Sequence, residues 1–254
     1  MNSCSNPALS LVIPCYNEEK NIPLILAALQ KTFAARAAEV EVILVNNGST
    51  DNSAAVLAAE LARAQAPYLK TTLVPKNLGY GYGILQGLEV ATGNVLAWTH
   101  ADMQTDPHDV LKAYDLFCSQ KGEKVFIKGR RLNRALLETL FTFGMQLLAS
   151  IALKTRLEDI NAQPKVFSRD FYATYMRLQA PHDFSLDLFA LYQARNNGFK
   201  VLDFPVTFAP RLHGEAKGGG GSWKMRWKLI KRTWAYIFEL RGKVMQTVKS
   251  TKIV

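Results

Sequence analysis

The stretch Asn94–Pro107, NVLAWTHADMQTDP, decides the fold class of this sequence. It opens with an apolar run, Val95–Trp98, that is typical of a short buried strand. Polar residues with metal-binding chemistry follow directly, at His100, Asp102 and Gln104. Ligands of open α/β sheets bind beyond the carboxyl ends of the strands, so a site is expected here. If the segment stays extended, alternate side chains point the same way, and these three would hold a divalent cation that bridges two phosphates.

A second interpretation of the same stretch is a strand followed by a solvated turn without a ligand. Pro107 would then start the next helix near its first position.

Length and composition favour a globular protein with an anionic partner. The chain has 254 residues, of which 48% are hydrophobic and 20% charged, so we expect one large α/β domain, with or without a C-terminal extension. The net charge of +10 favours nucleic acid, a membrane surface or a phosphate-rich substrate. Three cysteines without CxxC spacing indicate neither a disulfide framework nor a zinc cluster. The N-terminus lacks the features of a signal peptide.

Strands alternate with helices through the first half of the chain. Strand-like runs are expected at 9–14, 40–45, 71–74 and 95–98. Helices are expected after the first three, one capped by Asn21, one at about 52–66 capped by Thr50 or Asp51, and one through 84–90. This alternation predicts βαβ units and a mostly parallel central sheet flanked by helices.

The glycines of NLGYGYG, residues 77–83, do not form a dinucleotide-binding GxGxxG motif, because Ile84 and Gln86 stand where the third glycine is required. Gly79, Gly81 and Gly83 would instead let the backbone approach a ligand or form a tight turn without one.

Four motifs occur in a fixed order: IPCYNEEKN, LVNNGSTD, NLGYGYGILQG and HADMQTDP. Together they resemble glycosyltransferase family 2, and especially its dolichyl- and polyprenyl-phosphate sugar synthases, over about residues 9–215. The resemblance implies an α/β fold of the GT-A type, a nucleotide-diphosphate sugar donor, a divalent metal (Mg²⁺ or Mn²⁺) and an inverting transfer.

The donor-binding residues implied by the resemblance include Pro14, Tyr16 and Glu18, which match the first nucleotide-contacting segment. Asn46 and Asn47 match a pair that is usually Asp-Asp. An amide keeps hydrogen bonding, removes charge and adds a donor, so the base, uracil or guanine, is left open.

The metal-binding positions depart from the family pattern at His100, which replaces the first aspartate of a D-x-D motif. Imidazole suits Mg²⁺ less well than a carboxylate does. Asp102 matches the second aspartate and Gln104 a third ligand position. The metal would hold the diphosphate and neutralise the leaving group.

Basic and acidic residues of the second half match further family segments. Lys128 and Arg131, in KGRR, match a GxR segment whose arginine would face phosphate, although a surface basic run is the alternative. Asp159 and Lys165 match D-x-x-x-G-F-R, with Gln163-Pro164 in place of Gly-Phe.

Asp187 lies near the family's acidic residue in the acceptor region. It would act as a general base if the acceptor is a hydroxyl of a lipid-linked or surface glycan. A polyprenyl phosphate, already ionised, would need little base catalysis. Both acceptor classes are left open.

The run 199–208, FKVLDFPVTF, is expected to form an edge strand pair or a bent strand broken at Pro205. Arg211, His213 and Lys217 resemble a loop that closes over phosphates. Gly218–Gly221 is expected to be a linker or a mobile lid.

Two segments suggest contact with a membrane. Residues 135–153 are mostly apolar and, as a helix, would span roughly 28 Å, which makes a marginal membrane span, an interfacial helix or a buried helix. Residues 223–243 interleave aromatic and basic side chains, which favours an anionic membrane surface over single-stranded nucleic acid or a docked helix.

We therefore expect a catalytic domain at 1–217, a linker and amphipathic interfacial helix at 218–254, and a peripheral location on the cytoplasmic face of the membrane. No nucleic-acid partner is expected, and the oligomeric state is left open. The first alternative, motivated by Asn46, Asn47 and His100, is a catalytically inactive module of the same fold that binds nucleotide or membrane. A basic nucleic-acid binder is the second.

Overall fold

The structure is a computed structural model that describes residues 7–132, 146–213, 227 and 231–242. The chain divides into two compact units. The first comprises 1–133 and 161–214, and the second comprises 134–160 and 215–254.

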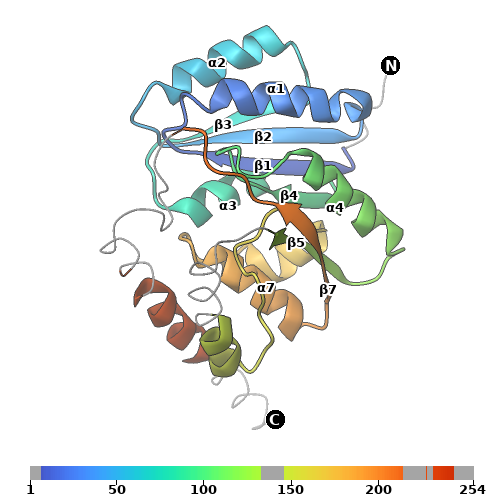
Figure 1. The fold of residues 1–254 in the computed structure, drawn as a ribbon, viewed down its shortest axis with the longest axis vertical. Helices are drawn as coiled ribbons and strands as arrows, with labels where there is room; N and C mark the ends of the chain where they lie inside the picture. The colour runs from blue at the N-terminus through green and yellow to red at the C-terminus, as the bar shows by residue number, and fades with distance from the viewer. Residues whose placement is uncertain (1–6, 133–145, 214–226, 228–230, 243–254) are drawn as a thin grey trace. The chain divides into compact units, whose positions relative to one another are not determined.

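A seven-stranded sheet forms the centre of the first unit, in the order β3-β2-β1-β4-β6-β5-β7 (Figure 1). Its β6 runs antiparallel to β4 and β5, whereas the remaining neighbours are parallel. The mostly parallel sheet is thereby confirmed. The strands are β1 Leu9–Cys15, β2 Val40–Asn47, β3 Leu69–Val74, β4 Val95–Trp98, β5 Val125–Leu132, β6 Lys165–Ser168 and β7 Lys200–Thr207.

Helices cover both faces of the sheet. The longer ones are α1 Ile22–Phe33, α2 Ser53–Ala64, α3 Tyr80–Val90, α4 His108–Ser119 and α7 Leu186–Asn196. The short ones are Ala34–Arg36, α6 Arg169–Phe171 and Tyr172–Met176. Because side chains alternate along a strand, Leu11 and Ile13 of β1 join one core with α1, α2 and α4, while Val12 faces Gly87 of α3 on the opposite side.

The parallel strands bring their carboxyl ends to one edge. In register, Cys15 at the end of β1 pairs with Asn46 of β2, and Val12 of β1 pairs with Trp98 at the end of β4. The loops after β1, β2 and β4 therefore emerge side by side at that edge. These loops hold the motifs that the sequence singles out.

The structure differs from the sequence-based expectations at one strand, at a strand that was not expected and at the helix caps. β7 is one unbroken strand, in which Pro205 pairs with Arg130; proline is tolerated because β7 lies at the sheet edge and needs no donor on its outer side. β6 was not predicted, because a four-residue strand carries too little periodicity. Asn21 makes no capping hydrogen bond. Asn52 precedes α2, while the Ser53 backbone amide at the start of the helix donates to Asp51 Oδ1 at 3.0 Å, so one of the two predicted caps, Asp51, contacts the helix start.

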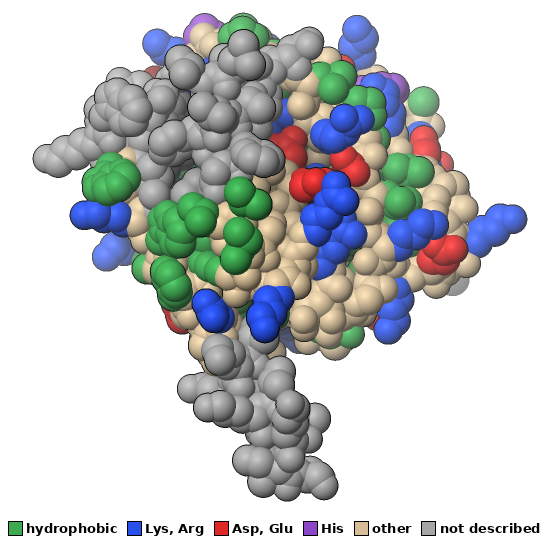
Figure 2. Space-filling view, turned by 60° about the horizontal axis from the view of Figure 1, so that its bottom comes forward, with side chains coloured by type: hydrophobic (Ala, Val, Ile, Leu, Met, Phe, Trp, Pro, Cys, Tyr) green, Lys and Arg blue, Asp and Glu red, His purple; other side chains and the backbone are tan. Residues whose placement is uncertain are grey.

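Of the second unit, the structure describes helical segments at 146–153 and 231–242. Three apolar side chains of the first segment, Leu147, Leu148 and Ile151, are exposed. The remainder of the predicted helix 135–153 lies outside the described residues, as do Gly218–Gly221 and much of 223–243. No helix within the described ranges is long and apolar enough to cross a bilayer. Among the described residues on the face drawn in Figure 2, acidic and basic side chains lie beside one another.

Candidate active site

Two carboxylates at the carboxyl edge of the sheet share one guanidinium. The Nη2 atom of Arg211 donates to Asp102 Oδ2 at 2.7 Å, and its Nη1 donates to Glu18 Oε1 at 3.3 Å. The side chain of Arg211 is 18% exposed, that of Asp102 is 8% exposed and that of Glu18 is 9% exposed. The three residues follow β7, β4 and β1, so the fold brings distant segments together. This part of the edge is built to hold positive charge between two acids.

A tight turn after β4 positions Asp102. The hydroxyls of Thr99 and Thr105 lie 3.1 Å apart and close the turn, and Met103 has a φ of 60°. Asp102 Oδ1 accepts a hydrogen bond from the Gln104 backbone amide at 3.2 Å. The segment is therefore bent, and the expectation of an extended segment is wrong.

Because of this bend, the three predicted metal ligands have separate partners. Asp102 faces Arg211, while the Gln104 side-chain amide donates to the Ala209 carbonyl at 3.1 Å. His100 Nε2 lies 3.0 Å from the Tyr80 hydroxyl. Within the described part of the chain, no three His, Cys, Asp or Glu side chains are grouped so that they could hold a metal ion.

The surroundings of His100 favour the neutral form of its imidazole. Burial lowers its pKa, and the cations Lys165 and Arg211 act in the same direction. The carboxylates of Asp102 and Asp187 oppose this shift without reversing it. Its neighbour Tyr80 is also neutral, because burial raises the pKa of its hydroxyl well above the ordinary value and the Asp187 carboxylate adds to the effect.

A fully buried ion pair lies next to this histidine. Lys165 Nζ of β6 pairs with Asp187 Oδ1 at the start of α7 and also donates to the Ala162 carbonyl at 3.0 Å. Gln163 Nε2 donates to the same Asp187 oxygen at 3.0 Å and to the Tyr80 hydroxyl at 3.4 Å. Lys165 is 0% exposed and Asp187 is 4% exposed. The predicted base is thus held inside the protein by a cation and an amide.

The asparagine pair of β2 makes local hydrogen bonds. Asn46 Oδ1 accepts from the Ser49 amide at 3.1 Å, and Asn47 Nδ2 donates to the Gly79 carbonyl at 3.0 Å. Among the described residues, Asn47 Oδ1 is buried without a hydrogen-bond partner. A ligand or water donor would satisfy this oxygen.

Packing against a neighbouring backbone segment favours glycine over a larger residue at position 79. Its φ is 126°, and a Cβ there would lie 2.3 Å from the His182 carbonyl oxygen. The close approach that the glycines predicted is therefore made to the protein's own backbone.

The two basic residues predicted on β5 have different environments. Lys128 is buried, and its Nζ lies 3.4 Å from the Gly129 carbonyl. Arg131 is partly buried, with its guanidinium 5.5 Å from the centre of the Phe208 ring.

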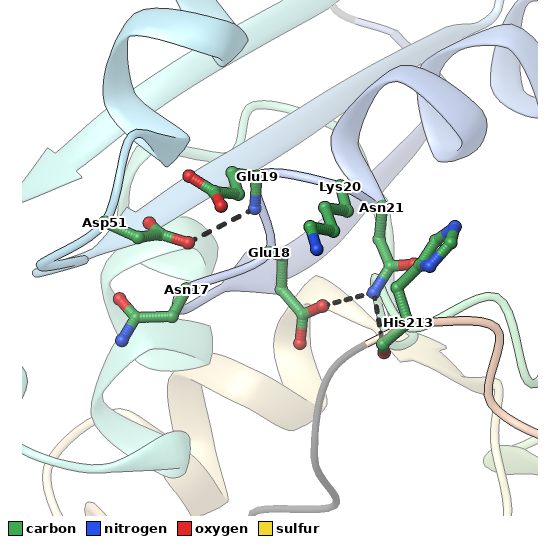
Figure 3. A pocket seen from close by; sticks show the side chains of 7 residues that line it. All are labelled: Asn17, Glu18, Glu19, Lys20, Asn21, Asp51 and His213. Atoms are coloured by element: carbon green, nitrogen blue, oxygen red, sulfur yellow. Dashed lines mark hydrogen bonds between the residues drawn. The ribbon is translucent and has the colours of Figure 1, made fainter.

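A pocket of about 170 Å³ opens beside the shared carboxylates. It is lined by Asn17, Glu18, Glu19, Lys20, Asn21, Asp51 and His213. In Figure 3, Asn21 Nδ2 points to Glu18 Oε2, at 2.5 Å, and to the His213 carbonyl, at 3.3 Å. The predicted nucleotide-contacting residues Pro14 and Tyr16 precede this loop and are partly buried.

Sequence reasoning missed two members of the site. Tyr80 and Gln163 are joined to His100 and Asp187 by hydrogen bonds, yet their separation along the chain gives no spacing signal. The contact of Arg211 with both acids was likewise not predicted, although its loop was expected near phosphates. Lys217 lies outside the described residues.

Several solved structures share this architecture. Glucosyl-3-phosphoglycerate synthase from Mycobacterium tuberculosis in complex with UDP is 15% identical over 93% of this chain and 80% of that chain, with a TM-score of 0.69. The same enzyme with Mn²⁺, UDP and phosphoglyceric acid is 16% identical over 93% and 79%, with a TM-score of 0.70. A structure described as a mycobacterial protein is 17% identical over 92% and 74%, with a TM-score of 0.69. These similarities establish a shared fold, which is the GT-A fold.

Sequence comparison gives the family independently. The model of Glycosyl transferase family 2 matches residues 10–165, which is more than half of the chain. The matched segment contains all of β1 except Leu9, together with β2, β4 and the turn that carries Asp102. The chain is a glycosyltransferase and belongs to glycosyl transferase family 2.

Proposed function

We propose that this glycosyltransferase moves a sugar from a nucleotide-diphosphate sugar onto a phosphate group, with inversion, and that the acceptor is a polyprenyl phosphate. The single observation that supports a phosphate acceptor is the buried ion pair between Asp187 and Lys165. A carboxylate buried in an ion pair is poorly placed to take a proton from a hydroxyl. A phosphate acceptor is already ionised and needs no such base.

The donor would bind at the carboxyl edge of the sheet. The pocket beside Glu18 lies at the ends of β1 and β2, where nucleotides of open α/β sheets are found. Tyr16 and Asn46 are near it in sequence, and Asn47 offers a buried oxygen without a described partner. That oxygen is an acceptor suited to an N–H group of a base or to a ribose hydroxyl.

A divalent metal fits the electrostatics of this edge. Asp102 and Glu18 already accommodate one cation, the Arg211 guanidinium. Asp102 and Gln104 would hold the metal together with oxygens of the donor diphosphate. When bound, the metal would neutralise the leaving diphosphate. His100, the third predicted ligand, stays a prediction.

Transfer itself requires one bond to form and one to break. An oxygen of the acceptor phosphate forms the bond to the anomeric carbon as the bond from that carbon to the diphosphate oxygen breaks. The electron pair leaves with the diphosphate. Arg211, once released from the two acids, would provide a cation for this charge, and Arg131 would do so for the acceptor. Asp187 as a general base stays a prediction for a hydroxyl acceptor.

A lipid acceptor is supported by exposed apolar side chains in the second unit. Leu147, Leu148 and Ile151 form a row on one helical face, and Phe238 and Trp227 are also exposed. Lys231 Nζ lies 5.8 Å from the Trp227 ring centre. Apolar and basic groups together favour an anionic membrane surface. We therefore keep the proposal of a peripheral protein on the cytoplasmic face.

The experiment that tests the proposal is a transfer assay with the full chain and Mn²⁺. UDP- and GDP-linked hexoses serve as donors. Polyprenyl phosphate in anionic vesicles, a soluble phosphorylated hydroxy acid and an unphosphorylated glycan serve as acceptors. We expect transfer to the polyprenyl phosphate and loss of transfer in Asp102→Asn.

The outcomes separate the parts of the proposal. Transfer only to the soluble phosphorylated acid would keep the phosphate acceptor and exclude the lipid. Transfer only to the glycan would return Asp187 to the role of base. If the protein neither hydrolyses nor transfers the sugar of any donor, the result would favour the catalytically inactive module.

A further inference from the structure

The residues after β7 form a strap, 209–213, at the carboxyl edge of the sheet (Figure 1). One end is tied to the turn after β4: the Ala209 amide donates to the Gln104 carbonyl at 2.9 Å, and Gln104 Nε2 donates back to the Ala209 carbonyl at 3.1 Å. The other end is tied to the loop after β1, where Asn21 Nδ2 donates to the His213 carbonyl at 3.3 Å (Figure 3). The strap therefore connects two of the loops that form the candidate site.

The middle residue of the strap places a cation between the two acids. The Arg211 guanidinium donates through Nη2 to Asp102 at 2.7 Å and through Nη1 to Glu18 at 3.3 Å. Its Nε is buried and, among the described residues, has no hydrogen-bond partner. A buried N–H without an acceptor is unfavourable, so these contacts do not use the full hydrogen-bonding capacity of the guanidinium.

The charges of these three side chains favour exchange of the cation. Asp102 and Glu18 carry two negative charges and Arg211 supplies one positive charge, so the three together keep one negative charge. A divalent cation would compensate both acids. Two cations a few Å apart in a poorly solvated site repel each other strongly, so Arg211 and a divalent cation would not share the space between the acids. Binding of one requires release of the other.

We propose that Arg211 is a tethered cation that holds the strap closed in the ligand-free protein, and that the strap must release it from both acids before a divalent metal can be held there. The partner that then receives the guanidinium, an oxygen of the donor diphosphate, rests on the proposed function. That oxygen would also satisfy the Nε–H group.

This exchange couples the strap to the metal. Coupling between two binding events is reciprocal, so a looser strap raises the affinity for metal, and metal binding loosens the strap. The diphosphate offers Arg211 a new anionic partner and thereby favours metal binding between the acids. Donor and metal would then bind together more tightly than either binds alone.

The first test measures hydrogen exchange of the strap amides by mass spectrometry, with the full chain and no ligand. We expect Arg211→Gln to speed exchange in 209–213 about tenfold, because the strap loses its hydrogen bonds to two charged groups. Arg130→Gln is the matched control, since it removes a guanidinium paired with Asp203 of β7, at 3.2 Å, and should leave the strap unchanged. Equal exchange of the strap in Arg211→Gln and in the unaltered protein would overturn the proposal.

The second test measures Mn²⁺ binding without nucleotide, from the electron paramagnetic resonance signal of free Mn²⁺. Pro210→Gly keeps the guanidinium and both acids but gives the open strap more conformations, so Mn²⁺ affinity should rise about two- to fivefold. Pro67→Gly, in the exposed turn before β3, is the matched control and should change nothing. Unchanged or weaker binding by Pro210→Gly, or no Mn²⁺ binding by any variant, would overturn the proposal.

Neither test uses a nucleotide, a sugar or an acceptor, so their outcome is separate from that of the transfer assay. If both tests give the expected result but no donor is turned over, the proposed function fails and the tethered cation stands. If transfer occurs but either test fails, the proposed function stands and Arg211 is a fixed structural contact.

Discussion

Removing the cation of the buried ion pair should destabilise the protein strongly. Lys165→Met keeps a chain of similar length but leaves the Asp187 carboxylate 4% exposed and without its ammonium partner. Breaking a buried pair in this way costs about 3–5 kcal/mol in free energy of unfolding. For a domain of this size, about 2–4 °C is lost per kcal/mol, so the melting temperature should fall by roughly 6–20 °C. Urea unfolding and thermal melting of the full chain measure both quantities.

Two further variants test whether the charge is the cause. In Lys165→Met combined with Asp187→Leu no charge is left unpaired, so most of the lost stability should return. Lys200→Met breaks an exposed pair with Glu123, at 3.0 Å, and should change stability by about 1 kcal/mol or less. If Lys165→Met is as stable as the unaltered protein, or if the double variant recovers nothing, the reasoning from buried charge is refuted.

Three other predictions concern separate parts of the fold. Burial by itself would raise the pKa of Glu41, but hydrogen bonds from a lysine, a serine and a threonine lower it from 4.5 to about 2. The ionised carboxylate therefore contributes about 3 kcal/mol to the free energy of unfolding above pH 4.5, and this contribution is lost as the pH falls towards 2. Urea unfolding between pH 7 and pH 3 should show the advantage over Glu41→Gln shrinking below pH 4.5, and a constant difference would contradict this. Arg211→Gln should raise the affinity of the nucleotide-free protein for Mn²⁺ by about tenfold, or about 1.4 kcal/mol, because a competing cation is removed; calorimetric titration that shows weaker binding would argue against a metal beside the two acids. Gly79→Ala should lower the free energy of unfolding by about 1–3 kcal/mol or more, and by more than Gly122→Ala does. Both glycines have a positive φ, but a Cβ at Gly79 would lie 2.3 Å from the His182 carbonyl oxygen, whereas a Cβ at Gly122 has no atom within 4 Å. Equal decreases in melting temperature for the two variants would show that packing adds nothing.

The parallel strands could be predicted because each is marked by a local sequence pattern. The apolar run Val95–Trp98 coincides with β4, and the expected strands at 9–14 and 40–45 lie within β1 and β2. Each is followed by polar residues and then by an amphipathic helix. The antiparallel β6 was missed because its position depends on pairing with β4 and β5, which are far away in sequence.

The site was predictable in its location but not in its connections. Asp102 was expected at the carboxyl edge from its place after a strand, and Glu18 was implied as a donor-binding residue by the family resemblance; the two carboxylates meet at that edge. Their shared contact with Arg211 depends on the path of the chain after β7, which no spacing reveals. The three predicted metal ligands have separate partners, because Met103, with a φ of 60°, turns the backbone between them.

The positions of Arg211 and Asp187 along the chain have a consequence for biosynthesis. The segment that matches the family model ends at residue 165, so it contains both acids of the edge and the lysine of the buried pair, but neither counter-ion. While a nascent chain emerges from the ribosome, these charges remain uncompensated until α7 and the residues after β7 are synthesised. A fragment that stops at the family boundary would therefore carry an incomplete charge balance in its interior, and ribosome-bound chains of that length should be more sensitive to protease than chains that extend past residue 213.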